Sequence, residues 1–131
     1  KSLNVVENVS LPLVIEGMKS DEAEKHAKKT LADLGISDFA KQMPTQLSGG
    51  QQQKVGLARA LVSNPWILMA DEPTGNLDSK SGNEIMEIFR QLNHEHKRTI
   101  LMVTHNEQYF DFGTRKVQMK DGEIIKDSKN G

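Results

Sequence analysis

The chain has 131 residues, a formal net charge of −1 and no cysteine. That length suits one domain or part of a larger one. The lack of cysteine excludes disulfides, thiolate catalysis and cysteine-ligated metals, and a net charge near zero provides no general attraction to nucleic acid or anionic lipid. No apolar run is long enough to span a membrane and no signal peptide is visible, so we expect another chain to provide any membrane-spanning segments.

The sequence begins at Lys1 rather than at methionine, and the next residues, "SLNVVENV", have neither a capping pattern nor the composition of a tail. We therefore expect the beginning of the protein to be missing from this chain. A processed or tag-cleaved N-terminus is the alternative.

The first half of the sequence predicts mainly helices. Pro12 and Gly17 interrupt the apolar clusters near its start. A helix is predicted next, from a cap at Ser20 or Asp21 to an end at Gly35. Its apolar stripe has spacings of four and three and consists of Ala23, Ala27, Leu31 and Leu34.

A second helix is predicted over residues 50–62. It begins abruptly at "SGG" and ends at Asn64-Pro65, because proline cannot continue a helix. We place a domain boundary near Pro65. It separates a mainly helical subdomain with a truncated start (residues 1–64) from a core portion (residues 65–131).

The second half of the sequence alternates strands with a helix. Residues 66–70 ("WILMA") and 99–103 ("TILMV") are apolar on both faces and predict two buried parallel strands. The helix between them follows "NLDS" and has one apolar side, formed by Ile85, Ile88, Phe89 and Leu92. Asp121-Gly122 lies between two short strands and predicts a hairpin. The alternation predicts an α/β fold with a parallel sheet at its core.

Polar residues crowd the point where each predicted parallel strand ends. Asp71 and Glu72 follow the first strand, and Thr104, His105 and Asn106 follow the second. Ligands of open parallel sheets bind at the carboxyl ends of the strands. Of two adjacent carboxylates, one can hold Mg²⁺ through water while the other accepts a proton from an attacking water. A histidine nearby can donate to a phosphate oxygen or orient that water.

Each of these features has a simpler structural interpretation when it stands alone. An Asp-Glu pair after a strand is commonly a solvated turn or a cap, and a histidine there is commonly structural. The "SGG" at residues 48–50 is usually a flexible turn, and Asp78 before Ser79 is most simply a helix N-cap. Their combined order and spacing favour a functional interpretation.

The order "LSGGQ", "ADEPT", "GNLD" and "VTH" resembles the C-terminal part of an ABC-type ATPase. The resemblance covers nearly the whole chain, and "ADEPTGNLD" is similar to the subgroup that serves lipoprotein-release, macrolide and antimicrobial-peptide exporters. It implies a P-loop-NTPase-like parallel sheet core, here without the P-loop strand, and a mainly helical signature subdomain. Lys54 and Gly56 depart from the family pattern, in which arginine and alanine are common.

The resemblance also implies a role for each matching residue. Asp71 matches the aspartate that positions Mg²⁺, Glu72 the catalytic glutamate that polarises the attacking water, and His105 the switch histidine that contacts the γ-phosphate. The signature motif, which faces ATP bound by a second subunit, corresponds to Leu47, Ser48, Gly49, Gly50 and Gln51. The D-loop, which crosses the subunit interface, corresponds to Gly75, Asn76, Leu77 and Asp78.

A Gly-rich phosphate-binding loop is absent from the sequence, since no G-x-x-x-x-G-K-[ST] pattern occurs. Such a loop holds the β- and γ-phosphates through backbone N–H groups and a lysine. The resemblance implies that the full-length protein hydrolyses ATP. Because this loop is absent, we expect this chain alone to be inactive. The family's adenine-stacking aromatic residue and Q-loop glutamine are expected upstream of Lys1.

These observations favour an ATP-binding and ATP-hydrolysing subunit of an ABC-type membrane exporter, with ATP and Mg²⁺ as cofactors that require the phosphate-binding loop. The resemblance also implies two partners: a second ATPase subunit, paired head to tail, and a transmembrane permease that holds the protein at the cytoplasmic face of the membrane. A non-catalytic module that donates only its signature motif is one alternative. The other is the C-terminal lobe of an SMC-type DNA-organising ATPase. It is disfavoured because no heptad repeat precedes "LSGGQ" and no basic surplus indicates nucleic-acid binding.

Overall fold

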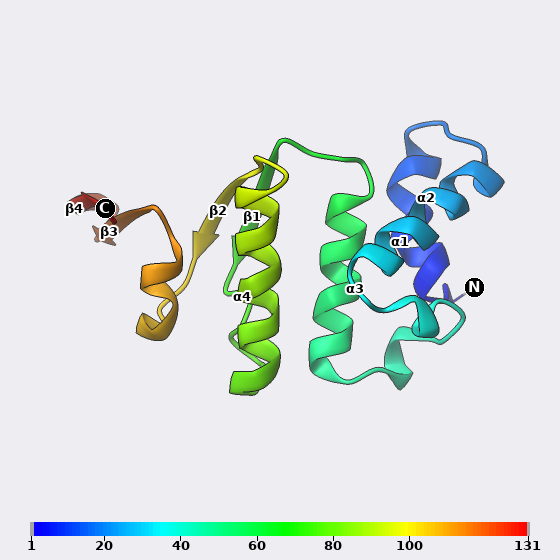
Figure 1. Cartoon of the computed structure of the whole chain (residues 1–131), viewed down its shortest axis with the longest axis horizontal. Helices are drawn as coiled ribbons and strands as arrows, with labels where there is room; N and C mark the ends of the chain where they lie inside the picture. The colour runs from blue at the N-terminus through cyan, green and yellow to red at the C-terminus, as the bar shows by residue number, and fades with distance from the viewer. Residues whose placement is uncertain (1, 131) are drawn as a thin grey trace.

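The computed structural model describes residues 2–130 and has an elongated shape (Figure 1). One end consists of the helices α1 (Val5–Ile15), α2 (Ser20–Asp33) and α3 (Gly49–Leu61). The middle consists of β1 (Ile67–Asp71), α4 (Ser79–His94) and β2 (Thr99–Val103), and the other end is the hairpin of β3 (Arg115–Lys120) and β4 (Glu123–Lys129). Short 3-10 helices occur at η1 (Ser37–Phe39), η2 (Pro44–Gln46) and η3 (Glu107–Phe112). Within residues 2–130, no helix combines the length and the hydrophobicity needed to cross a membrane.

The helical end is held together by one apolar stripe of α1. Val5, Val9 and Leu13 lie four residues apart and are buried against α2 and α3. Asn4 starts the helix with a capping box, so the expectation that "SLNVVENV" has no capping pattern is wrong. The helix runs through Pro12, so the interruption predicted there is wrong. A proline inside a helix costs about 3 kcal/mol, which is less than the roughly 5–9 kcal/mol contributed by burying three such side chains.

Helix α2 packs its small apolar side chains against α1. Ala23, Ala27 and Leu31 are fully buried, as predicted, whereas the fourth predicted member, Leu34, is the C-cap residue and only partly buried. The predicted cap at Ser20 or Asp21 is wrong, because Ser20 is already the first helical residue and Lys19 is the N-cap. Within residues 2–130, the Lys19 side chain makes no capping hydrogen bond. The stability of α2 therefore depends on its buried face rather than on its start.

Strands β1 and β2 pair in parallel, in register from Ile67 opposite Thr99 to Asp71 opposite Val103. Helix α4 connects the two strands and lies beside them in Figure 1. A strand–helix–strand connection of this kind places both carboxyl ends at one edge of the sheet. The arrangement agrees with the α/β fold expected from the sequence.

Only one face of this two-stranded sheet is buried among residues 2–130, so the prediction of strands buried on both faces is wrong for them. Leu68 packs in the cluster under α4, whereas Ile67, Met69, Leu101 and Val103 are more than half exposed. Alternate side chains of a strand point to opposite faces, and no described element covers the face that α4 leaves open. Apolar residues on both faces of a strand indicate that both faces suit burial, but not which neighbour covers them.

The hairpin of β3 and β4 turns at Asp121-Gly122, as predicted. Asp121 has φ 51° and Gly122 has φ 84°, the two positive values that a tight two-residue hairpin turn requires. Arg115 of β3 binds Asp127 of β4 through two hydrogen bonds of 2.9 and 2.6 Å. The side-chain hydrogen bond from Arg115 lowers the pKa of Asp127, so this pair joins the two strands as ions.

The buried side chains form two hydrophobic clusters, and α3 contributes to both. The first cluster joins α1, α2 and α3 and includes Val55 and Ala58, whereas Leu57 belongs to the second cluster with β1, α4 and η3. Lys54 of α3 also forms an ion pair with Glu84 of α4 at 2.9 Å. Helix α3 therefore connects the helical end to the middle of the molecule.

Replacing Gly56 by alanine is expected to stabilise the protein by roughly 0.5–1 kcal/mol. Gly56 is exposed inside α3, and an added Cβ meets no described atom within 4 Å outside its own helix backbone. Alanine therefore restricts the unfolded chain at no steric cost to the folded one. Urea unfolding measures the change. Gly50→Ala is the matched control in the same helix, because its Cβ would lie 2.8 Å from the Ser81 Oγ and should destabilise. Equal shifts from the two changes would contradict the prediction.

Candidate functional site

The backbone leaves β1 through an unusual conformation at Glu72. Its φ is 44°, in the left-handed region that residues other than glycine rarely adopt. The Glu72 N–H donates to the Val103 carbonyl at 2.8 Å, which extends the pairing of β1 with β2 by one residue beyond Asp71. Residues held in this conformation store strain and cluster at functional sites.

Three groups from the end of β2 hold the Glu72 carboxylate. The His105 N–H donates to Oε1 at 2.9 Å, the His105 Nδ1 lies 2.7 Å from the same oxygen, and the Thr104 hydroxyl donates to Oε2 at 3.2 Å. The hydrogen bond from the His105 side chain is the main cause of the lowered pKa of Glu72, and partial desolvation opposes it. Glu72 is therefore ionised at neutral pH, as a group that accepts a proton from water must be.

The contact with Glu72 decides how the ring of His105 can bind a ligand. A carboxylate only accepts hydrogen bonds, so we place a proton on Nδ1, which leaves Nε2 on the far side of the ring. The His105 side chain is 85% exposed, so Nε2 is open to solvent. A ring that donates from Nδ1 can also donate from Nε2 only as imidazolium, whereas the neutral ring accepts a hydrogen bond there.

Asp71 ends β1 with an exposed carboxylate, directly before Glu72. Among residues 2–130, no group of three or more acidic or histidine side chains is arranged around one metal position. A single carboxylate is still a suitable protein ligand for Mg²⁺, which in nucleotide sites takes one or two carboxylates together with phosphate and water oxygens.

Two overlapping turns over residues 72–77 lead towards α4. The Gly75 N–H donates to the Glu72 carbonyl at 3.1 Å, and the Leu77 N–H donates to the Thr74 carbonyl at 3.1 Å. Asp78 then caps the helix: one carboxylate oxygen accepts from the Ser81 N–H at 3.0 Å and the other from the Ser81 hydroxyl at 2.8 Å. The backbone hydrogen bond from Ser81 is the main cause of the lowered pKa of Asp78. The helix-cap interpretation of Asp78 is therefore confirmed.

The "LSGGQ" motif starts α3. Leu47 is buried in the helical cluster, and Ser48 is the N-cap in a capping box with Gln51. The Ser48 Oγ accepts from the Gln51 N–H at 3.3 Å, so its own proton remains free to donate to a ligand. The N–H groups of Gly49 and Gly50 lie at the helix start, where they have no intrahelical partner and the helix dipole favours an anion.

The two glycines of this motif also differ in their packing. A Cβ on Gly50 would lie 2.8 Å from the Ser81 Oγ and 2.9 Å from the Ser81 Cβ, whereas a Cβ on Gly49 would lie 3.6 Å from the Leu77 Cδ2. The contacts at Gly50 are too short to exist, and the contact at Gly49 is an ordinary one. Gly50 therefore permits the close approach of α3 and α4, a role that the sequence interpretation, based on access for phosphate, did not include.

The structure brings Glu72 and His105 into direct contact, with Asp71 beside them at the end of the sheet. It places the "LSGGQ" motif elsewhere, against residues 75–78 and the start of α4. The roles assigned to these residues remain predictions. Thr104 was named among the polar residues that follow the second strand but was given no role, and the structure shows that its hydroxyl donates to Glu72.

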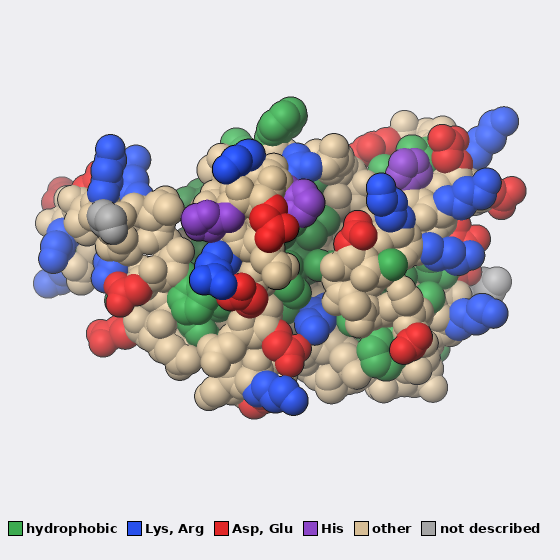
Figure 2. Space-filling view, in the orientation of Figure 1, with side chains coloured by type: hydrophobic (Ala, Val, Ile, Leu, Met, Phe, Trp, Pro, Cys, Tyr) green, Lys and Arg blue, Asp and Glu red, His purple; other side chains and the backbone are tan. Residues whose placement is uncertain are grey.

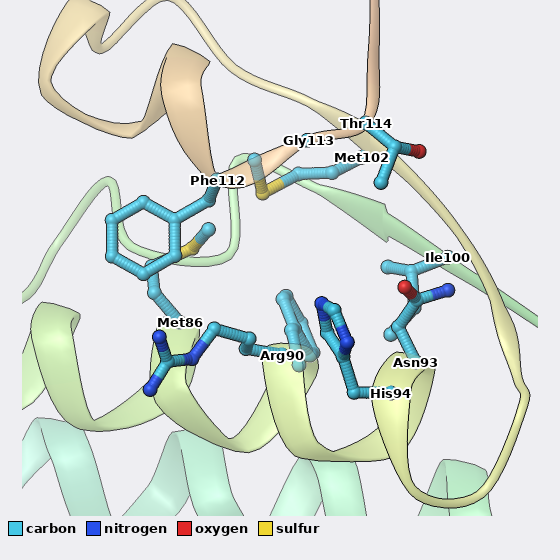
Figure 3. A pocket seen from close by; sticks show the side chains of 10 residues that line it. Met86, Arg90, Asn93, His94, Ile100, Met102, Phe112, Gly113 and Thr114 are labelled. Carbon is cyan, nitrogen blue, oxygen red and sulfur yellow. The ribbon is translucent and has the colours of Figure 1, made fainter. Parts of the chain in front are cut away.

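A small cavity of about 90 Å³ lies between α4, β2 and residues 112–114 (Figure 3). Met86 and Phe112 give it apolar walls, and Arg90 and His94 reach it from α4. None of the predicted site residues lines it. The cavity is smaller than the roughly 300–1,000 Å³ of typical small-molecule sites.

Charged side chains of both signs are mixed on the face drawn in Figure 2. Basic side chains gather over the hairpin and over the helical end, with acidic side chains among them. Contact with duplex DNA requires a more continuous basic surface. This face therefore does not support the DNA-organising alternative.

Comparison with known proteins matches residues 1–75 to the family described as ABC transporter. The chain is 48% identical over 122 residues to an uncharacterized ABC transporter ATP-binding protein of Thermotoga maritima, and the aligned region covers 93% of this chain and 52% of that protein. It is 49% identical over 128 residues to the macrolide export ATP-binding/permease protein MacB of Aggregatibacter actinomycetemcomitans, and the aligned region covers 98% of this chain and 20% of MacB.

A solved structure is also similar to this chain. It is the dimeric, post-hydrolysis state of the ATP-binding cassette MJ0796 of Methanocaldococcus jannaschii, bound to ADP and Pi. The TM-score is 0.83 and the identity 44%, over 97% of this chain and 56% of that one. This likeness confirms the predicted fold class. The chain spans about half the length of the Thermotoga protein and of MJ0796.

Proposed function

The chain belongs to the ABC transporter family, and from this membership we propose that it supplies the water-activating, switch and signature parts of an ATP-hydrolysing cassette in a membrane exporter. Because the chain spans only about half of its single-cassette relatives, the activity is proposed for the assembled cassette. By this term we mean the natural polypeptide or complex in which these residues meet a Gly-rich phosphate-binding loop.

The observation that carries the proposal is the Glu72 carboxylate, held at the carboxyl ends of β1 and β2. It is ionised, 34% exposed, and kept in one orientation by His105 and Thr104. A water placed between this carboxylate and a phosphorus atom can lose its proton to Glu72 as it attacks. Since the hydrogen bonds already orient the carboxylate, little reorganisation is needed during the reaction.

ATP and Mg²⁺ are the proposed cofactors. Membership of the family implies ATP binding, and bound Mg²⁺ neutralises charge on the phosphoryl group that is transferred. Asp71 would hold the ion, directly or through water. The outward-facing Nε2 of His105, as imidazolium, would donate to an oxygen of the γ-phosphate. The phosphate-binding loop of the assembled cassette would hold the remaining phosphate oxygens.

A second ATPase subunit is the proposed partner for the signature motif. The related MJ0796 cassette is a dimer bound to ADP and Pi. In a head-to-tail pair, the Ser48 hydroxyl and the N–H groups of Gly49 and Gly50 would face the γ-phosphate of ATP held by the other subunit. MacB is an ATP-binding/permease protein, and we propose that a permease likewise places this cassette at the cytoplasmic face of the membrane.

The division of the chain near Pro65 is part of the proposal. Residues 1–64 would form the signature subdomain, and residues 65–131 a portion of the catalytic core. The two hydrophobic clusters support this division, although Leu57 of α3 belongs to the second of them. The exposed apolar face of β1 and β2 would be covered in the assembled cassette.

Phosphate release by two preparations tests the proposed function. The assembled cassette is expected to hydrolyse Mg²⁺–ATP. The 131-residue chain alone is expected to show no turnover, because its sequence contains no phosphate-binding loop. Turnover by the isolated chain, or an assembled cassette that binds no ATP, would overturn the proposal. Binding to duplex DNA with micromolar or higher affinity would favour the SMC-type alternative instead.

A further inference from the structure

The first two turns of α4 contact two segments that lie far apart in the sequence. On one side is the signature end of α3, and on the other is η3, which begins two residues after His105. The neighbouring residues Ser81 and Gly82 make these two contacts. Consecutive residues of a helix project about 100° apart, so one turn of α4 can face both segments at once.

The contact with η3 is made by Tyr109, whose side chain is buried. A Cβ on Gly82 would overlap the Tyr109 hydroxyl oxygen and lie 3.4 Å from the Tyr109 Cζ, so the ring lies against bare backbone. Gln108 also donates to the Asn83 Oδ1 at 3.2 Å, and the Tyr109 N–H donates to the Asn106 carbonyl at 3.1 Å. The placement of Tyr109 on α4 therefore positions the segment that directly follows the switch histidine.

The contact with α3 is equally close. Gly50 faces Ser81 without room for a side chain, and the Ser81 hydroxyl is itself held by Asp78 at 2.8 Å. Further along the two helices, Lys54 pairs with Glu84 at 2.9 Å. The signature end of α3 therefore cannot shift along α4 without breaking these contacts.

We propose that the start of α4 is a joint that ties the switch segment to the signature helix of the same subunit, with Gly82 and Tyr109 as its positioning residues. The inference rests on the proposed function, in which His105 faces the subunit's own ATP and the signature faces the ATP of its partner. A displacement of η3 then changes the positions of both His105 and the signature motif. Through this joint, each subunit couples the two ATP sites of the dimer.

Gly82→Ala in the assembled cassette tests the switch side of the joint. The added methyl group displaces Tyr109 and the segment that positions His105, so kcat is expected to fall about 10- to 100-fold with little change in KM for ATP. Tyr109→Phe removes the overlapping hydroxyl and is expected to retain wild-type turnover by itself. In the double variant Gly82→Ala/Tyr109→Phe, most of the lost kcat is expected to return, because the overlapping hydroxyl is gone.

Steady-state hydrolysis, ATP binding and thermal unfolding are measured on each variant. An unchanged kcat in folded Gly82→Ala, or a double variant as slow as Gly82→Ala, would overturn the inference. If Gly82→Ala does not fold, Tyr109→Leu removes the ring and leaves α4 intact, and a wild-type kcat in that variant would overturn it as well. A wild-type cassette without any turnover would overturn the proposed function, and this inference with it.

A mixed dimer tests the signature side of the joint. One subunit carries Glu72→Gln, so only the ATP held by the other, unaltered subunit is hydrolysed. In the head-to-tail pair, that ATP faces the signature motif of the Glu72→Gln subunit. Adding Gly82→Ala to the Glu72→Gln subunit leaves the switch of the active subunit unaltered. Turnover is nevertheless expected to fall about 5-fold or more, and to recover when Tyr109→Phe is added to the same subunit. Unchanged turnover would overturn the coupling.

Discussion

Glu72→Gln is expected to lower the turnover of the assembled cassette about 10²- to 10⁴-fold, the usual contribution of a general base. The amide has the shape of the carboxylate, and its oxygen can still accept hydrogen bonds from the backbone and ring of His105. It cannot take a proton from water. ATP binding should therefore persist while hydrolysis stops, and the two-subunit complex that contains ATP should accumulate.

Size-exclusion chromatography with and without Mg²⁺–ATP, together with a phosphate-release assay, measures both effects. Glu95→Gln is the matched control, because Glu95 lies at the C-terminal end of α4 while the candidate site lies near the N-terminal end. It should leave turnover and assembly unchanged. If Glu72→Gln stays monomeric with ATP and continues to hydrolyse it, Glu72 is not the base.

Local patterns predicted the elements whose boundaries depend on neighbouring residues. Ser48 and Asp78 start α3 and α4 because their side chains reach N–H groups three residues further along. Gly35 follows α2 with φ 69°, and Asp121-Gly122 forms the hairpin turn through two positive φ values. Each of these interactions spans a few residues, so the local sequence contains nearly all the information that decides it.

Predictions failed where contacts between distant segments outweigh local preference. Helix α1 continues through Pro12 because Val9 and Leu13 are buried against α2 and α3. Helix α2 forms without a capping side chain at its N-cap, Lys19, because its alanine stripe is buried. The same limit applies to β1 and β2. Their composition predicts strands, but which face is covered depends on where α4 packs.

The candidate site was predicted as a set of residues but not as an arrangement. Asp71, Glu72 and His105 follow two strands and match family motifs, which is enough to select them. The hydrogen bonds that hold Glu72 depend on the register of β1 against β2 and on the positive φ at Glu72, and no local pattern determines either. The packing of Tyr109 on Gly82 is equally a tertiary contact, because a glycine inside a helix has several common explanations.

Gly49→Asp is expected to lower the turnover of the assembled cassette by at least about 10²-fold, the effect of losing a preorganised anion-stabilising contact. The new carboxylate places bulk and negative charge where the exposed N–H groups of Gly49 and Gly50 would meet a phosphate. Gly50→Asp would also stop hydrolysis, but its Cβ collides with Ser81, so broken packing would explain the loss equally well. At Gly49 the Cβ makes only a 3.6 Å contact with the Leu77 Cδ2.

Stability and charge can be separated at this position. An acidic residue in the first turn interacts favourably with the helix dipole, so urea unfolding should show Gly49→Asp to be no less stable than Gly49→Asn. The asparagine variant, which has the same shape without the charge, is the control and should lose less turnover. ATP binding to a single subunit should be unchanged in both, because the signature faces the ATP of the other subunit. Wild-type turnover in Gly49→Asp, or loss of ATP binding by its separated subunit, would contradict the role of the signature in trans.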